Sequence, residues 1–390
     1  MTPTLAEYTT LGLGGPAGTF VDASSEPHLI EAVRAADAVG DSLLLIGGGS
    51  NLVIADDGFP GTVIHVNTRG LDYRQAADAA DAVEVTVAAG EDWDGVVAAA
   101  VAEGLAGLES LSGIPGRAGA TPIQNVGAYG REVAEVITQV RVYDRQKARI
   151  QVIPNERCSF TYRSSLFKSA GLSSPGGADS PHGGLPPLIP PGPRTPRGES
   201  DGKAKISDTP RYVVLDVTFR LARQALSMPV RYAELAAELG VQMGERAGVG
   251  EVRSAVLKIR ARKGMVLNPG DPDTRSAGSF FTNPVITTDE LAQVEAAAVA
   301  RGAGQVPRYE AGAGLVKVPA AWLIEHAGFA KGYGAPGPTR VSSKHTLALI
   351  NAGDATTADL LALAREIVSG VRATFGVTLT PEPILVGVTL

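Results

Sequence analysis

Three polar residues stand in surroundings that could make them chemically active: Arg163, Ser279 and Glu382. Arg163 lies in the run FTYRSSLFK, and an arginine side chain can hold a carboxylate with two hydrogen-bond donors. Glu382 stands between two prolines, which stiffen the backbone and can aim a carboxylate well. Ser279 follows a glycine and precedes two phenylalanines, so its hydroxyl could face a ligand in a partly dry site. The alternatives are a surface ion pair, a solvated glutamate and a turn serine, and each signal alone is weak.

A stretch with five glycines, GIPGRAGATPIQNVGAYG from Gly113 to Gly130, predicts a backbone cradle. Glycine accepts backbone angles that other residues avoid, so its amide groups can approach a ligand closely. Gln124 and Asn125 add paired hydrogen-bond donors and acceptors. The stretch therefore fits a loop that holds a bulky polar ligand, and a long structural loop with tight turns is the alternative.

A second glycine run, Gly47-Gly48-Gly49-Ser50-Asn51, directly follows Ser42–Ile46, which we expect to be a buried strand. Consecutive free amides after a strand can point at one phosphate. The run is not a dinucleotide fingerprint, because Leu52 stands where the last glycine is needed, and it lacks the GK(S/T) of a P-loop. A second match to GxGxxG is formed by Gly332, Gly334 and Gly337. We reject it as a dinucleotide-binding motif, because it follows a helical pattern and has Pro336 where a helix should begin.

Length, charge and composition narrow the class of protein. The 390 residues suffice for roughly two or three domains, and the net charge of −6 argues against a general nucleic-acid-binding protein. The single cysteine, Cys158, excludes an intrachain disulfide framework and is expected to be structural, and the histidines form no HExxH pair, so we expect no metal site. No signal-peptide pattern and no membrane-spanning apolar run is present, so we expect a cytoplasmic protein without membrane insertion. No pattern specifies an oligomeric state.

Hydrophobic periodicity predicts a mixture of helices and strands, in an α/β or α+β arrangement. The expected helices are 28–39, 94–103 and 252–262, one that follows a turn near 228–240, one that begins at Pro319, and a last one after a capping box of Thr356 and Asp359. The expected strands are 42–46, 62–66, 83–88, 136–143, 148–153 and 212–221. Between them, 171–210 is crowded with proline, glycine and serine, and we expect a disordered or mobile insertion.

Six motifs, in order along nearly the whole chain outside that insertion, resemble those of the UDP-N-acetylenolpyruvoylglucosamine reductases, also called UDP-N-acetylmuramate dehydrogenases. The motifs are GGGSNLV, LESLSGIPGRAGATPIQNVGAYG, FTYRSSLFK, AGSFFTNP, GLVKVPAAWLIE and the terminal PEP. Tyr232, in VRYAEL, resembles the substrate-covering tyrosine of one subgroup of this family.

The resemblance implies an α+β fold: an FAD-binding region of the vanillyl-alcohol-oxidase type made of two subdomains, 1–70 and 71–225, and a C-terminal substrate domain, 226–390. It implies that both glycine loops hold FAD, with backbone amides around the pyrophosphate. Neither loop contains a histidine, so we expect noncovalent FAD. The cofactor-binding residues that it implies are Gly47, Gly48, Gly49, Ser50, Asn51, Pro115, Gly116, Gly119, Ala120, Gln124, Asn125, Gly127, Ala128 and Gly130.

The resemblance also implies the chemistry. NADPH supplies a hydride to the flavin, and the reduced flavin passes a hydride to the enolpyruvyl double bond of a UDP-sugar. Ser279 is then the proton donor, and Arg163 and Glu382 flank and stabilise the enol intermediate. The implied substrate-binding residues are Tyr232, Asn283, Lys317 and Lys331, with Arg260, Lys263 and His345 as weaker candidates. His345 as an ordinary packing residue is an equal alternative.

Two other functions stay open at this point. One is an FAD-dependent oxidase of the same superfamily that acts on another alcohol. The other is an inert protein that binds a flavin or a nucleotide sugar. The joint presence of Arg163, Ser279 and Glu382 argues against an inert protein.

Overall fold

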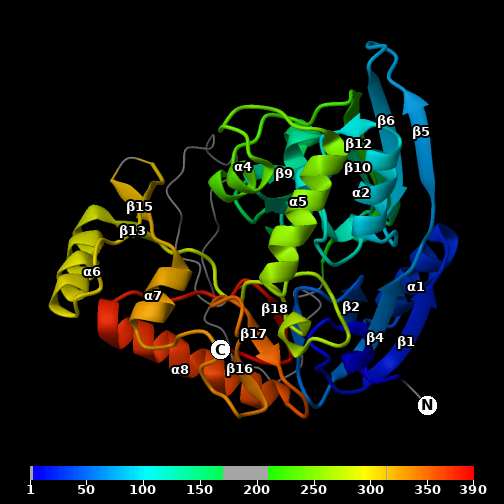
Figure 1. Ribbon diagram of the computed structural model, residues 1–390. Helices are drawn as coiled ribbons and strands as arrows, with labels where there is room; N and C mark the ends of the chain where they lie inside the picture. Colours follow the sequence, from blue (N-terminus) through cyan, green and yellow to red (C-terminus); the bar gives the residue numbers. More distant parts are fainter. Residues whose placement is uncertain (1–2, 170–209, 313) are drawn as a thin grey trace.

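The computed structural model describes residues 3–169, 210–312 and 314–390, and Figure 1 shows three groups of elements arranged around a shared centre. The insertion predicted at 171–210 lies outside the described residues, apart from Pro210. The chain begins in a parallel sheet, continues into an antiparallel sheet, and ends in a helical group whose last strand returns to the start of the fold.

The first group is a three-stranded parallel sheet in the order β1-β4-β2. Its strands are β1 (Ala17–Ala23), β2 (Leu43–Ile46) and β4 (Phe59–Val66), and α1 (Glu26–Ala38) packs beside β1 and β4. Ser25 caps α1 by accepting from the backbone N–H of His28 at 3.4 Å. The glycine loop 47–51 begins where β2 ends.

The second group is an antiparallel six-stranded sheet with the strand order β11-β10-β12-β6-β5, in which β7 also pairs with β12. The strands are β5 (Leu71–Gln75), β6 (Ala82–Ala88), β7 (Leu105–Ala106), β10 (Ile137–Asp144), β11 (Arg149–Pro154) and β12 (Tyr212–Arg223). A large apolar core joins this sheet to α1 and α2 (Trp93–Ala102), with Trp93 packed against Phe219 at 5.6 Å between ring centroids. The strands predicted at 136–143 and 148–153 are confirmed as β10 and β11, which pair with each other in antiparallel.

The stretch from Gly113 to Gly130 crosses one side of this sheet as an irregular segment. It holds η3 (Ala118–Ala120) and the start of a small hairpin, β8 (Gly127–Ala128) with β9 (Arg131–Glu132). Two further helices, α4 (Ala233–Leu239) and α5 (Val249–Arg262), form a separate apolar cluster against it. The other short segments are η1 (Leu5–Tyr8), η2 (Glu109–Leu111), η4 (Val133–Glu135), η5 (Asn155–Arg157), η7 (Pro272–Thr274) and α3 (Leu166–Ser169).

The third group packs three helices, α6 (Thr288–Ala300), α7 (Ala320–His326) and α8 (Thr357–Phe375), around a second core. The predicted capping box of α8 is confirmed, because the Thr356 hydroxyl accepts from the Asp359 N–H at 3.1 Å and the Asp359 carboxylate accepts from the Thr356 N–H at 2.9 Å. Pro319 is the N-cap of α7 rather than a first-turn residue. The small strands here are β13 (Val285–Thr287), β14 (Tyr309–Glu310), β15 (Leu315–Lys317), β16 (Thr339–Val341) and β17 (Leu349–Asn351).

The end of the chain ties the third group to the first. After α8, strand β18 (Ile384–Val386) pairs in parallel with β3 (Leu52–Ile54), which directly follows the glycine loop 47–51. The Ile384 N–H donates to the carbonyl of Asn51 at 2.9 Å. This pairing places Glu382 beside a loop that is more than three hundred residues away in the sequence.

Candidate functional site

The two glycine loops predicted from the sequence touch each other. A Cβ added to Gly48 would lie 2.7 Å from the Cα of Gly116, so each loop excludes a side chain from the other. Gly116 has a φ of 129°, which side-chain-bearing residues rarely adopt. The Ser50 hydroxyl donates to the carbonyl of Pro115 at 2.9 Å and holds the loops together. The contact explains why glycine is needed at both positions.

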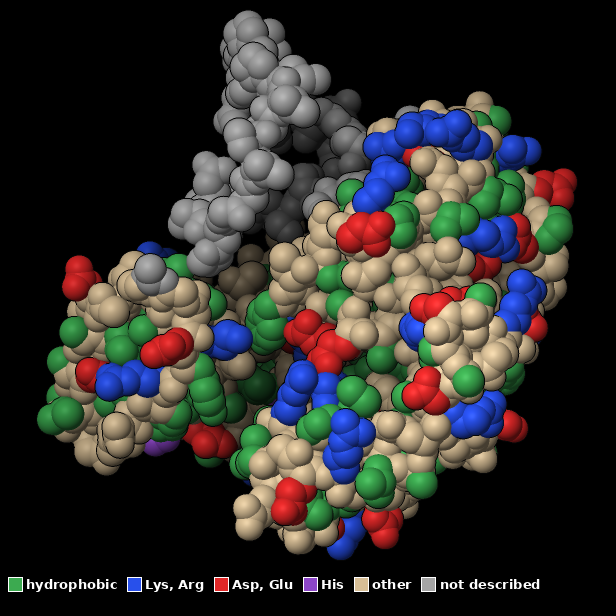
Figure 2. Space-filling model, turned by 90° about the horizontal axis from the view of Figure 1, so that it is seen from above, with side chains coloured by type: hydrophobic (Ala, Val, Ile, Leu, Met, Phe, Trp, Pro, Cys, Tyr) green, Lys and Arg blue, Asp and Glu red, His purple; other side chains and the backbone are tan. Residues whose placement is uncertain are grey.

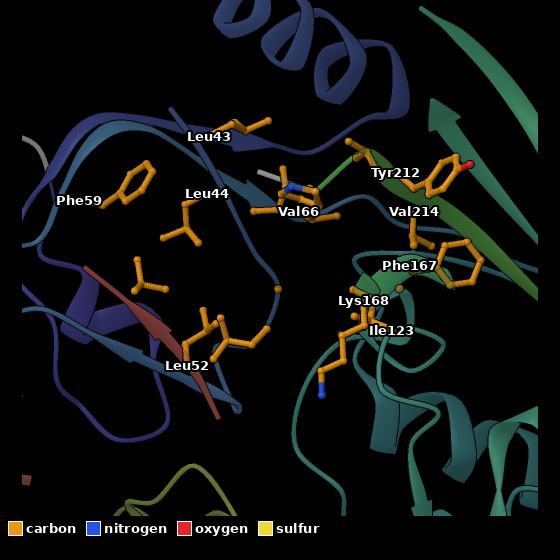
Figure 3. Close-up of a pocket in the computed structure, with 18 of the residues that line it drawn as sticks. Leu43, Leu44, Leu52, Phe59, Val66, Ile123, Phe167, Lys168, Tyr212 and Val214 are labelled. Atoms are coloured by element: carbon orange, nitrogen blue, oxygen red, sulfur yellow. The ribbon is translucent and has the colours of Figure 1, made fainter. Parts of the chain in front are cut away.

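An apolar cavity of about 470 Å³ lies between the two sheets on one side of these loops. Figure 3 shows its two sides: Leu43, Leu44 and Val66 come from the parallel sheet, and Phe167, Tyr212 and Val214 face them from α3 and β12. The end of the chain also lines it, from Ile384 at the start of strand β18 to Thr389. The cavity is therefore built jointly by both sheets and the returning tail.

A second cavity, of about 260 Å³, continues from the first past Gly47 and Arg117. It is lined by both glycine loops and by all three residues that the sequence singled out for chemistry, Arg163, Ser279 and Glu382. The Arg163 Nε lies 3.2 Å from the Glu382 Oε1, so these two side chains form an ion pair. Residues from three distant parts of the chain thus meet in one cavity.

Ser279 and Glu382 are positioned by the same backbone contacts. The Glu382 N–H donates to the carbonyl of Phe280 at 2.9 Å, and Phe281 forms a bridge with Pro381. Phe280 and Phe281 are buried, so they anchor this loop in the core. Ser279 is half-buried, and its hydroxyl forms no hydrogen bond to the residues that the structure describes. It is free to meet a ligand.

Arg163 is held in an uncommon backbone conformation, with a φ of 53°. Non-glycine residues with positive φ cluster at functional sites, because the surrounding structure must hold them there. Here the Lys168 ammonium donates to the Arg163 carbonyl at 3.1 Å. Asn125 donates to the carbonyl of Thr161 at 3.2 Å and so fixes the same loop from the other side.

The second cavity is positively charged. Its charged lining residues are Arg117, Arg163, Arg260 and Glu382, that is, three cations and one carboxylate. Burial raises the pKa of the Glu382 carboxyl, and the charges of Arg163 and Lys168 oppose that shift. Burial also lowers the pKa of the Lys168 ammonium. Such an arrangement favours an anionic ligand.

Three buried polar atoms in the described residues lack a hydrogen-bond partner, and all three belong to residues that line the second cavity: Arg117 Nε, Gln124 Nε2 and Arg260 Nε. Buried donors without a partner are rare and costly. All three are donors, so a ligand rich in acceptor atoms would satisfy them. The isoalloxazine, ribityl and pyrophosphate groups of FAD carry such acceptors, and the apolar cavity beyond suits an aromatic base, so the residues present fit FAD.

Most of the predicted cofactor-binding residues line this pair of cavities. Those on the second cavity are Gly47, Gly48, Gly49, Ser50, Asn51, Pro115, Gly116, Ala120, Gln124 and Gly127, and Gly119 lines the apolar cavity. Asn125, Ala128 and Gly130 line neither cavity. Asn125 instead stabilises the loop, because its amide donates to Glu132 at 2.7 Å and accepts from the Ala134 N–H at 3.2 Å.

Arg260 lines the second cavity, whereas the other predicted substrate-binding residues line neither cavity. Several of them gather near His345. Burial, together with the charges of Lys263, Lys331 and Arg260, lowers the pKa of His345 to about 4, so this imidazole is neutral at pH 7. Lys263 forms an ion pair with Glu234 at 2.5 Å. Figure 2 shows a hollow between the lobe that carries α6 and the rest of the molecule, with lysine and arginine side chains at its border.

The remaining predicted substrate residues have partners of their own. Tyr232 packs edge-on against Tyr129, with 5.4 Å between ring centroids, and the Lys317 ammonium lies 4.2 Å from the ring centroid of Tyr162. Asn283 accepts from the Ala320 N–H at 2.9 Å, which caps the start of α7.

Sequence reasoning missed Arg117 and Lys168 as site residues, although both stand inside quoted motifs. The sequence around Arg117 indicates a loop and that around Lys168 the start of a helix. Only the folded structure shows that both residues line the cavities. Cys158 is fully buried, and burial raises its thiol pKa to about 12, in keeping with a structural residue. None of the described helices is long and apolar enough to cross a bilayer.

The cavity is built by a parallel sheet, an antiparallel sheet and two glycine loops in contact. The family model described as FAD binding domain matches residues 17–152, so this is an FAD-binding flavoprotein. The family model described as UDP-N-acetylenolpyruvoylglucosamine reductase, C-terminal domain, matches residues 271–386. The chain belongs to the UDP-N-acetylenolpyruvoylglucosamine reductase family. The predicted fold class, family and FAD cofactor are confirmed.

Relatives of that name match along the whole chain. One from Thermobifida fusca (strain YX) is 51% identical, covering 99% of this chain and 97% of the relative. One from Streptomyces coelicolor is 49% identical, covering 99% of this chain and 90% of the relative. The crystal structure of UDP-N-acetylenolpyruvylglucosamine reductase from Thermus caldophilus has a TM-score of 0.58 at 23% identity, covering 99% and 98% of the two chains, and supports the fold.

Proposed function

We propose that this chain reduces the enolpyruvyl group of UDP-N-acetylglucosamine enolpyruvate to UDP-N-acetylmuramate, with NADPH as reductant, in peptidoglycan precursor synthesis. The observation that carries the proposal is the meeting of Arg163, Ser279 and Glu382 in the cavity lined by both glycine loops. Bound FAD, held noncovalently, supplies the hydride transfer between the two substrates.

Ser279 is the proposed proton donor. Its hydroxyl is half-buried and free of hydrogen bonds to the described part of the chain, and the loop that carries it is anchored by two buried phenylalanines. Hydride addition to the enolpyruvyl carbon distant from the carboxylate leaves a basic carbon next to that carboxylate. A well-placed hydroxyl can protonate such a carbon although serine is a weak acid in water.

Arg163 and Glu382 are proposed to flank the enol and the substrate carboxylate. A fixed guanidinium offsets negative charge that grows in the transition state, and the uncommon backbone conformation at Arg163 fixes its direction. The 3.2 Å ion pair with Glu382 restrains the guanidinium before substrate arrives. Lys168, through the Arg163 carbonyl, supports the same arrangement from behind.

We assign the rest of the substrate to the positively charged region around His345. The lysines around the neutral His345, with Arg260 on the cavity wall, provide positive charge suited to a diphosphate. Tyr232, Asn283 and Lys317 are proposed contacts on either side. We further propose that the chain is divided into three parts, 1–70, 71–225 and 226–390. We also propose that it acts in the cytoplasm without nucleic-acid or membrane partners.

The experiment that tests the function is a product analysis with the purified full chain. NADPH consumption should depend on the enolpyruvyl nucleotide sugar, and mass spectrometry should show that the product has gained two hydrogen atoms. Oxygen consumption with an alcohol substrate, together with no NADPH oxidation, would assign the protein to the oxidases instead. NADPH oxidation without any reduced sugar would contradict the proposed reaction.

A further inference from the structure

Arg117 lies where the two cavities join. Among the described residues that line both cavities, Arg117 is the only charged one, and its neighbours there are apolar or glycine. A dinucleotide that extends from one cavity into the other must pass this point. The charge of Arg117 therefore faces the middle of such a ligand rather than either end.

The backbone around Arg117 is held firmly. The Trp93 N–H donates to the carbonyl of Gly116 at 3.1 Å, and the Ala118 N–H donates to the carbonyl of Glu91 at 2.9 Å. The aliphatic stem of Arg117 packs on Gly47, where an added Cβ would lie 3.1 Å from the Arg117 Cγ. These contacts fix the backbone at Arg117 and hold the stem of its side chain against Gly47.

The guanidinium lacks a partner within the described parts of the chain. Its Nε is buried without a hydrogen bond, and Arg117 takes part in none of the ion pairs found there. The carboxylates of Glu91 and Asp92, which lie beside the backbone contacts of this loop, bind other groups. Glu91 accepts from the Gly70 N–H at 2.7 Å, and Asp92 caps α2 by accepting from the Gly95 N–H at 2.9 Å.

We propose that Arg117 pairs with the pyrophosphate of FAD and makes the site selective for phosphate-bearing flavins. The inference rests on the proposed function and adds a side chain to a phosphate site otherwise made of backbone amides. Backbone amides orient a phosphate but carry no net charge, whereas an arginine supplies a full charge and a planar set of donors that matches phosphate oxygens.

The test measures the Kd of FAD, FMN and riboflavin for the full chain stripped of flavin, by fluorescence titration. Arg117→Met keeps the stem that packs on Gly47 and removes the charge. We expect its Kd for FAD to rise about tenfold to a hundredfold, which is the range for a hydrogen bond to a charged group. The Kd of FMN should rise in the same direction, and that of riboflavin, which has no phosphate, should stay within about twofold.

Two further variants make the result decisive. Arg117→Lys keeps the charge without the planar donors. Its preference for FAD over riboflavin should lie between that of Arg117→Met and that of the natural chain. Arg74→Met, on the exposed strand β5, is the matched control and should bind all three flavins normally. Should Arg117→Met fail to fold, the FAD-to-riboflavin preference of Arg117→Lys decides.

Equal loss of FAD and riboflavin binding in the variants would overturn the inference, because it would mean that Arg117 only supports the loop. Unchanged FAD binding would overturn it as well. Failure of the natural chain to bind FAD would instead contradict the proposed function, so the two failures are distinguishable.

Discussion

Arg163 shows at the residue scale how this site is held. Its φ of 53° is unfavourable for an arginine, and contacts from Lys168 and Asn125 fix its loop. The Glu382 carboxylate completes the arrangement at 3.2 Å. The sequence identified Arg163 and Glu382 as candidates from a polar motif and two prolines, but the ion pair between them depends on the return of the chain end, which no local pattern reveals.

Ser279 can be tested by removing one oxygen atom. In Ser279→Ala the flavin should still be reduced by NADPH, while reduction of the nucleotide sugar should slow by about a hundredfold to ten-thousandfold, the usual contribution of a positioned proton donor. Stopped-flow absorbance of the two half-reactions measures both rates. Ser254→Ala, on the exposed face of α5, is the control. Two unchanged half-reactions in Ser279→Ala would remove Ser279 from the mechanism.

Lys168 should set the pH at which Glu382 titrates. Burial raises the Glu382 pKa and the Lys168 charge lowers it, so Lys168→Met should raise that pKa further. The corresponding limb of the profile of kcat/KM against pH then moves to higher pH, whichever protonation state of Glu382 is active. Lys168→Arg should restore the profile, and Lys147→Met, on an exposed turn, should leave it unchanged. A shift to lower pH would contradict this account.

At the scale of helices, strands and loops, hydrophobic periodicity and glycine density predicted different features of the structure. Strand patterns depend on local periodicity. The strands predicted within 136–153 are confirmed as β10 and β11, and the strand predicted at 212–221 is confirmed as β12. The three-residue strands β3 and β18 are too short to carry a period, yet their pairing positions Glu382. The density of glycines in the sequence predicted a cradle, whereas the contact between Gly48 and Gly116 is visible only in the folded structure.

That contact gives a prediction for the loops. In Gly48→Ala the new Cβ would lie 2.7 Å from the Cα of Gly116, and backbone cannot give way as a flexible side chain can. We expect a destabilisation of about 1–3 kcal/mol, as for overpacking elsewhere, and weaker FAD binding, measured by urea unfolding and flavin titration. Gly250→Ala, which meets open space, is the control. Normal FAD affinity in Gly48→Ala would show that the loops need not touch.

At the scale of the whole molecule, the cavities are shared by parts that are otherwise separate. Both sheets, strand β18 and the residues after it line the apolar cavity, and a loop of the third group carries Ser279 to the second cavity. A ligand that fills both cavities therefore contacts every group of elements. The confirmed family and the full-length match to its relatives agree with a chain organised around one flavin. The division into three domains stays a prediction.

Such a shared site predicts a cofactor-dependent stability. FAD that binds only the folded chain stabilises it by about 2.7 kcal/mol at a hundred times its Kd. The Tm of the reconstituted full chain, measured by calorimetry, should therefore exceed that of the stripped chain and rise further with FAD concentration. AMP, which lacks the flavin half, should have a smaller effect at the same concentration. An identical Tm with and without FAD would contradict a site shared by all groups.

An anaerobic absorbance titration of the purified full chain tests the proposed reaction directly. We expect a flavin spectrum that bleaches on addition of NADPH and returns on addition of UDP-N-acetylglucosamine enolpyruvate, with one substrate molecule consumed per flavin. A flavin that NADPH does not bleach, or that the nucleotide sugar does not reoxidise, would contradict it.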